Sequence, residues 1–359
     1  MYHTTSGVLF AASLGAALAA QGPSDSVPSA DATSAPASAG TTTPLDGAPQ
    51  PDALGRPSDL LRELRLAQQD PDYSLRALFQ QAHGDFMLAH ERFDPMIELS
   101  AGALPNGNVS SEPGDFDLFT LGADVDVPVM IAPDSFLRFG TFFGSRHYQT
   151  KGMGSSFGDE TLYDAGVHVG LGWFVTDDVL LELDLRPGFW SDWDGTLHHQ
   201  DFDLPASALA TVRYSEQLFF KLGARYNEVY EDANLLPWVG VSWTNEFVRF
   251  DLMLPESLEL SLWPSPDFGV LFGAEARGAE YHVRGPVGSG KPRNDIRVQE
   301  LLVYTGATWR FSDYTSLQVR GGAAVAGDYK VDDGTNALPS ITGTLDPSFF
   351  VDVTFGIDF

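Results

Sequence analysis

Residues 163–173 read YDAGVHVGLGW, in which two kinds of side chain alternate. Its odd-numbered positions carry aromatic or aliphatic side chains, whereas its even-numbered positions carry only glycine, aspartate or histidine. A period of two is the spacing of a β-strand, because successive side chains of a strand point to opposite faces. The pattern predicts a strand with one apolar face and one polar face.

The same alternation continues from Phe93 to the last residue. It predicts fourteen strands, at 94–104, 116–127, 135–148, 163–173, 181–186, 205–214, 218–227, 234–243, 247–254, 257–263, 268–283, 296–311, 315–327 and 347–359. Short and mostly longer connections alternate along this series. An even strand number with that asymmetry is typical of bacterial outer-membrane barrels. Pro255 and the very short connection at 254–258 leave twelve strands as an alternative.

Charged residues on these runs share the face opposite the apolar one. A soluble sandwich also alternates, but charge on a lipid-facing surface destabilises a membrane barrel, so these groups are expected to point inward. The predicted fold is therefore all-β, a closed antiparallel transmembrane β-barrel over residues 91–359. The candidate pore-lining residues are Glu98, Asp124, Asp126, Arg138, Asp164, His168, Glu182, Asp184, Arg186, Arg213, Lys221, Arg225, Arg249, Asp251, Arg277, Arg310, Arg320 and Asp352.

The signs of these charges are segregated along the chain. Acids dominate the first five strands and the last, and bases dominate the sixth to ninth. In a closed barrel the two groups would face one another across the interior. A water-filled gap predicts a porin-like passive channel for small polar or charged solutes, whereas a narrow gap predicts a closed structural or adhesive barrel. Fourteen strands enclose more space than the eight-stranded type that side chains fill, which favours the channel.

Aromatic residues crowd the strand ends beside the short connections. They are Trp173, Phe174, Tyr214, Trp243, Phe247, Trp263, Phe268, Trp309, Phe311 and Tyr314. Such rings prefer the headgroup level of a bilayer, so they predict an aromatic girdle. The chain ends on FFVDVTFGIDF at 349–359, which resembles the C-terminal insertion signal of outer-membrane proteins. That resemblance implies that the barrel assembly machinery reads Phe355, Ile357 and Phe359 during insertion.

The residues before the barrel divide into three segments. Residues 1–20 hold an apolar core and small residues in A-x-A spacing, which predicts a signal peptide, although Met1 to Ser6 lack the usual Lys or Arg. Residues 21–57 are rich in Ala, Ser, Thr and Pro and predict a disordered linker. Residues 58–90 predict a short helical periplasmic segment, with helices at 58–69 and 73–82. This segment is expected to be a tether, with a barrel plug as the alternative. The expected location is the outer membrane, after export through the secretory pathway.

Composition excludes several function classes. The absence of cysteine excludes disulfides and thiolate chemistry, and a net charge of −28 argues against nucleic acid. HHQDFD at 198–203 offers metal-ligand types without a fixed geometry, so no metal site and no cofactor is predicted. His168 and Asp164 share a face but no nucleophile is identifiable, so no catalytic residue and no enzyme is predicted. The expected partners are outer-membrane lipids and the assembly machinery, with the solute unknown.

Two stretches carry a family resemblance. LRPGFWSDWDG at 185–195 and RYNEVYEDANLLPWVGVSWTNEFVRFDLMLP at 225–255 are similar to an uncharacterised outer-membrane β-barrel family, a domain of unknown function. The resemblance spans roughly residues 90–359. Thr244 and Asn245 follow Trp243 where that family has a Pro-Asn turn, so this turn departs from the family pattern. The family has no known active site, so the resemblance implies a location and a fold and no chemistry.

Overall fold

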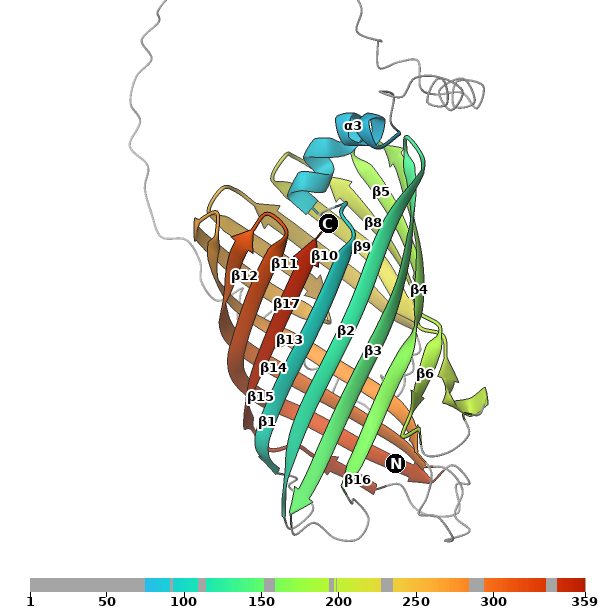
Figure 1. The fold of residues 1–359 in the computed structure, drawn as a ribbon, viewed down its shortest axis with the longest axis vertical. Helices are drawn as coiled ribbons and strands as arrows, with labels where there is room; N and C mark the ends of the chain where they lie inside the picture. Colours follow the sequence, from blue (N-terminus) through green and yellow to red (C-terminus); the bar gives the residue numbers. More distant parts are fainter. Residues whose placement is uncertain are drawn as a thin grey trace, which may run out of the picture. The chain divides into compact units, whose positions relative to one another are not determined.

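A computed structural model describes residues 75–90, 93–108, 114–151, 159–193, 197, 199–226, 235–283, 294–333 and 341–358. The chain divides into two compact units, Met1–Tyr73 and Ser74–Phe359. The first unit lies outside the described residues, and with it the predicted signal peptide, linker and helix at 58–69. The second unit is a helix followed by a closed sheet (Figure 1).

The sheet is antiparallel around its whole circumference, apart from one residue pair that links β6 to β13 in parallel. Its segments in the first half are β1 (Met96–Asn108), β2 (Asp115–Ala132), β3 (Ser135–Lys151), β4 (Glu160–Thr176), β5 (Val179–Leu185), β6 (Gly188–Ser191), β7 (Phe202–Asp203), β8 (Ala206–Arg213) and β9 (Leu218–Tyr226). Those in the second half are β10 (Leu235–Thr244), β11 (Val248–Leu254), β12 (Ser257–Ser265), β13 (Phe268–Val283), β14 (Asn294–Ser312), β15 (Thr315–Asp333), β16 (Ile341–Thr344) and β17 (Ser348–Asp358). Because β1 pairs with both β2 and β17, the sheet is a closed barrel.

Fourteen strands form this barrel, as the alternation predicts. Within the described residues, β5 continues as β6, β7 as β8 and β16 as β17, so the seventeen segments make fourteen continuous strands. The alternative of twelve is wrong. The region around Pro255 is a tight hairpin in which Met253 of β11 pairs with Ser257 of β12.

Strand length divides the wall into two parts. Strands β8 to β12 have 7 to 10 residues, whereas β2 to β4 and β13 to β15 have 16 to 19. At about 3.3 Å per residue and a tilt of about 40°, the short strands rise about 18–25 Å and the long ones about 40–48 Å. The long strands therefore project well beyond the short ones at the end where the longer loops lie.

The projecting part has a polar outer surface. Arg297 of β14 pairs with Glu280 of β13 at 2.7 Å, and Lys151 of β3 pairs with Asp117 of β2 at 2.6 Å. The wall below it is apolar on the outside, where Leu121 and Leu222 are 60% and 65% exposed. The outer surface therefore changes from apolar to charged along the long strands.

A single helix, α3 (Leu75–His90), precedes the barrel within the described residues. Figure 1 shows it at the end of the barrel where the short turns and the C-terminus lie. The predicted helix at 73–82 is too short. Phe86 and Met87 follow Phe79 by seven and eight residues, so they continue its apolar stripe for two more turns. No described helix has the length and the apolar character needed to cross a membrane.

Candidate functional site in the barrel interior

The short-turn end of the barrel is partly closed by α3. An apolar surface, which we name the aromatic seat, faces inward at this end. It consists of Phe136 of β3, Phe174 of β4, Leu180 of β5 and Phe219 of β9. The Phe86 ring of α3 lies 5.1 Å from the Phe174 ring and 5.3 Å from the Phe219 ring. Because these side chains are at most 3% exposed, the helix and the strands share one dry core.

Two residues predicted for the outer aromatic girdle belong to the interior instead. Phe174 follows the outward Trp173 and therefore occupies the opposite face, where it is 3% exposed. Trp263 shares its face with Glu259 and Ser261, and its ring lies under the Arg310 guanidinium at 4.3 Å. The girdle residues that the structure does expose on the outside are Trp173, Tyr214, Phe247, Trp309, Phe311 and Tyr314.

A polar cavity of about 380 Å³ lies in the other half of the same end. Strands β11 to β15 and the end of β17 line it, whereas the aromatic seat belongs to β3, β4, β5 and β9. Its lining mixes both signs of charge with hydroxyl and amide groups, including Arg249, Asp251, Glu259, Arg310, Thr308, Ser316 and Gln318. The helix therefore covers one part of the mouth, and a hydrophilic recess occupies another.

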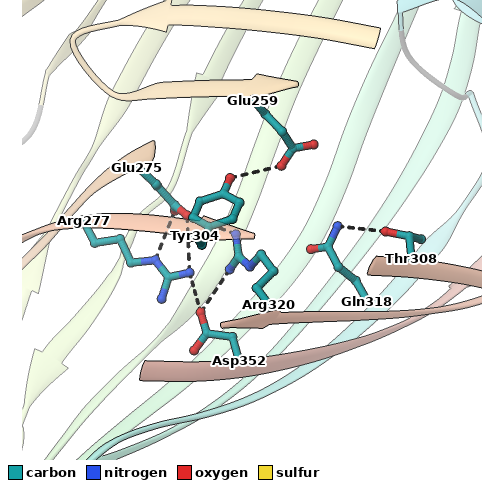
Figure 2. Close-up of polar contacts among 8 residues, drawn as sticks. All are labelled: Glu259, Glu275, Arg277, Tyr304, Thr308, Gln318, Arg320 and Asp352. Carbon is teal, nitrogen blue, oxygen red and sulfur yellow. Dashed lines mark hydrogen bonds and ion pairs between the residues drawn. The ribbon is translucent and has the colours of Figure 1, made fainter. Parts of the chain in front are cut away.

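A charged layer crosses the middle of the interior, and Figure 2 shows its densest part. Asp352 of β17 accepts hydrogen bonds from Arg277 of β13 at 2.9 Å and from Arg320 of β15 at 3.2 Å. Glu275 pairs with the same two arginines, each at 3.2 Å. We name these four residues the central ion-pair cluster. Beside it, the Tyr304 hydroxyl donates to Glu259 at 3.0 Å (Figure 2).

The opposite wall carries a second group of ion pairs. Arg186 lies 3.2 Å from Asp124 and 3.8 Å from Asp184. Arg138 lies 3.8 Å from Asp126 and 3.9 Å from Glu182, and His168 lies 3.3 Å from Asp126. This wall is acidic in sequence, but its own arginines neutralise much of that charge.

The basic strands are balanced in the same local way. Arg213 pairs with Asp178 at 2.8 Å, and Arg225 pairs with Glu256 at 3.0 Å. Both Lys221 and Arg249 pair with Asp251. The predicted opposition of an acidic wall and a basic wall is therefore not what these pairs show. Each base finds an acid on a nearby strand or turn, because long side chains reach adjacent strands more readily than the far side of the barrel.

Several groups in this layer are in contact with solvent. The side chains of Arg186 and Asp184 are 43% and 34% exposed. Both residues face inward, so the exposed area belongs to the inside of the barrel. The middle of the barrel therefore contains solvent-accessible charge, unlike a core filled by side chains.

The long-loop end contains an apolar core that sequence reasoning missed. Inward side chains of the projecting strands fill it, including Phe116, Leu118, Tyr148, Leu162, Tyr281, Ile296, Val298 and Phe350. The Tyr281 hydroxyl of β13 donates to Asp164 of β4 at 3.0 Å, and these strands lie on opposite sides of the barrel order. Ser191 of β6 also donates to the His282 carbonyl at 3.0 Å. We name this region the loop-end core.

A signal for the loop-end core was available in the sequence. In β2, Phe116 and Leu118 share the inward face with Asp124 and Asp126. A face that changes from charged to apolar along one strand marks a change from a wet interior to a dry one.

The remaining predicted positions fall as follows. Glu98 of β1 faces the charged layer near Asp124 and Glu275. Phe355 and Ile357 of β17 pair with Leu99 and Ile97 of β1, whereas the side chain of Phe359 lies outside the described residues. No cluster of three His, Asp or Glu residues suited to a metal occurs in the described parts of the chain. In the HHQDFD stretch, His199–Asp201 form a short 3-10 helix, and His198 is not described.

No protein-family model matches the chain, and no curated protein matches it in sequence. The resemblance noted at 185–195 and 225–255 therefore has no family model behind it. Among solved structures, an outer membrane channel from Pseudomonas putida F1 is similar at 9% identity and a TM-score of 0.40, over 74% of this chain and 96% of that chain. The P. putida toluene transporter TodX is 8% identical with a TM-score of 0.39, over 76% of this chain and 91% of that chain.

A third structural neighbour is the translocator domain of the autotransporter NalP from Neisseria meningitidis. It is 13% identical with a TM-score of 0.32, over 84% of this chain and 98% of that chain. Every one of these TM-scores is below 0.5, so these neighbours do not determine the function of the chain.

Proposed function

We propose that the protein is a bacterial outer-membrane β-barrel that acts as a gated channel for small polar or charged solutes. The observation that carries the proposal is the charged, solvent-accessible layer inside a fourteen-stranded wall. In this conformation the layer lies between α3, which covers part of the short-turn end, and the loop-end core, and these two elements are the gates of the proposed channel. The pore-lining residues of this channel are the charged side chains that form the layer.

The outer surface supports a membrane location. Apolar residues such as Leu121, Val169, Leu183 and Leu222 are exposed around the barrel, far beyond the patch size that a soluble monomer tolerates. The short strands rise about 18–25 Å, close to the apolar band of about 25 Å in outer-membrane barrels. A closed sheet also satisfies all its backbone groups, which lipid requires.

Orientation follows from the turns. Outer-membrane barrels keep short turns in the periplasm and long loops outside the cell. In this orientation α3 and the polar cavity face the periplasm, and the loop-end core faces the exterior. Outer-membrane lipids and the barrel assembly machinery are then the partners, and export depends on the predicted signal peptide.

A second candidate function is a closed structural or adhesive barrel. The loop-end core favours it, because Tyr281 is fully buried and its hydroxyl ties β13 to Asp164 on the opposite wall. The two candidates differ in whether the core and the helix can move aside.

Planar-bilayer conductance of the refolded full-length chain separates them. The test variant is Phe79→Ser with Phe86→Ser, which removes the apolar contact between α3 and its seat, alone and combined with Tyr281→Ser. Leu88→Ser is the matched control, because Leu88 is on the same helix and is 85% exposed. We expect rare openings for the unaltered chain, the control and the double variant, and frequent openings for the triple variant, in which both the helix and the core are loosened. Folded variants that never conduct would establish the closed structural barrel.

A further inference from the structure

We propose that α3 is an acid-sensitive plug, and that protonation of His83 releases it from the mouth of the barrel. The inference concerns how α3 binds its seat, and it rests on the proposed function only for its effect on conductance.

His83 lies at the centre of the contact between helix and barrel. It is 5% exposed and stacks on the Phe174 ring, with 3.8 Å between centroids and an interplanar angle of 5°. The Phe79 ring meets it edge-on at 5.2 Å. Protonation of His83 therefore disturbs the packing of α3 against β4.

Its hydrogen bonding fixes the tautomer of the neutral ring. Nε2 lies 3.2 Å from the Pro133 carbonyl, and a carbonyl only accepts, so Nε2 carries the proton. The other nitrogen, Nδ1, is buried and has no hydrogen-bond partner within the described part of the chain. A second proton would therefore point into an apolar environment without an acceptor, which is costly for a charged group.

The charged groups that face His83 come from the turns and strands around the mouth. Asp177 and Asp134 favour the protonated ring, as does the Pro133 carbonyl, whereas Arg213 disfavours it. Burial among the aromatic rings has the largest effect, and it holds the pKa of His83 below its ordinary value.

The direction of the pH effect follows from this lowered pKa. Once pH falls below about 6.5, a released helix binds a proton that the docked helix does not. Docking therefore weakens as pH falls from about 6.5 to the lower pKa of the docked state. Above about 6.5 both states are neutral and docking does not depend on pH.

The absence of cysteine allows a direct measurement on the full-length chain refolded into vesicles. Met87→Cys places a thiol in the dry seam, where Met87 is 5% exposed. Leu88→Cys places one on the exposed side of the same turn and corrects for the pH dependence of thiol reactivity. The measured quantity is the ratio of their labelling rates with a charged maleimide, at about pH 7.5 and about pH 5.5.

We expect this ratio to rise by up to about tenfold at the lower pH, since one pH unit below the ordinary histidine pKa of about 6.5 can change the population by at most about that factor. Placing His83→Phe or His83→Gln in both cysteine variants should abolish the rise. Phe keeps the ring stacking, and Gln keeps a donor for Pro133. An unchanged ratio, or a rise that persists in both His83 variants, overturns the proposal. Because labelling requires no current, this result is independent of whether the barrel conducts.

Discussion

Replacing Asp352 by Asn should destabilise the barrel by about 2–4 kcal/mol. Asp352 is 8% exposed and receives one hydrogen bond from Arg277 and one from Arg320. A hydrogen bond to a charged group contributes about 1.5–3 kcal/mol, and removing one partner of a buried pair leaves the other charge uncompensated. Glu275 keeps its contacts with both arginines and the new amide oxygen still accepts, so the loss stays below the sum of two such bonds.

Urea unfolding of the refolded protein in vesicles, followed by tryptophan fluorescence, measures this loss. Asp184→Asn is the matched control. Asp184 is also an inward acid, but it is 34% exposed and lies 3.8 Å from Arg186, so we expect a loss below about 1 kcal/mol. Equal losses for the two variants, or a stable Asp352→Asn protein, would refute the argument that the central ion-pair cluster stabilises the interior.

Two further predictions concern other parts of the barrel. Gly172→Ala should weaken α3 docking by about 1–3 kcal/mol, seen as faster labelling of Met87→Cys, because the new methyl group overlaps the Phe136 ring. Gly170→Ala on the same face is the control and should leave labelling unchanged, since its added methyl group would lie 3.2 Å from its nearest neighbour, the Arg138 side chain. Equal effects of the two substitutions would contradict the role of Phe136. Ile357→Asp should reduce heat-modifiable, membrane-inserted protein, because the charge enters the lipid-facing side of the β1–β17 seam. Normal insertion of that variant would contradict our interpretation of the C-terminus.

The alternation in the sequence was sufficient to predict the strands and their number. It also assigns the inner face, because the side chains of a strand alternate strictly. The predicted run at 116–127 nevertheless stops short of β2, which reaches Ala132. Pro128 and Met130 are apolar residues on the inward face, so the polar half of the alternation is lost there. Val129 and Ile131 continue the apolar outward face.

What alternation cannot predict is the neighbour of an inward side chain. Arg213 meets Asp178 in a turn, and Tyr281 meets Asp164 across the barrel, at sequence separations of 35 and 117. Such partners depend on strand tilt and on the different lengths of the strands. For the same reason the helix at 73–82 could be predicted as a helix, but its seat among Phe136, Phe174 and Phe219 could not.

The seam between β1 and β17 determines the order in which the molecule can be completed. Residues 96–103 pair with residues 351–358, whereas the other neighbouring strands are consecutive in the chain. Those consecutive pairs can form as hairpins while the rest of the chain is still being inserted, but the barrel closes only after β17 has been inserted. A product truncated before β17 would leave β1 and β15 as two open edges, and their backbone groups would find no partner in lipid.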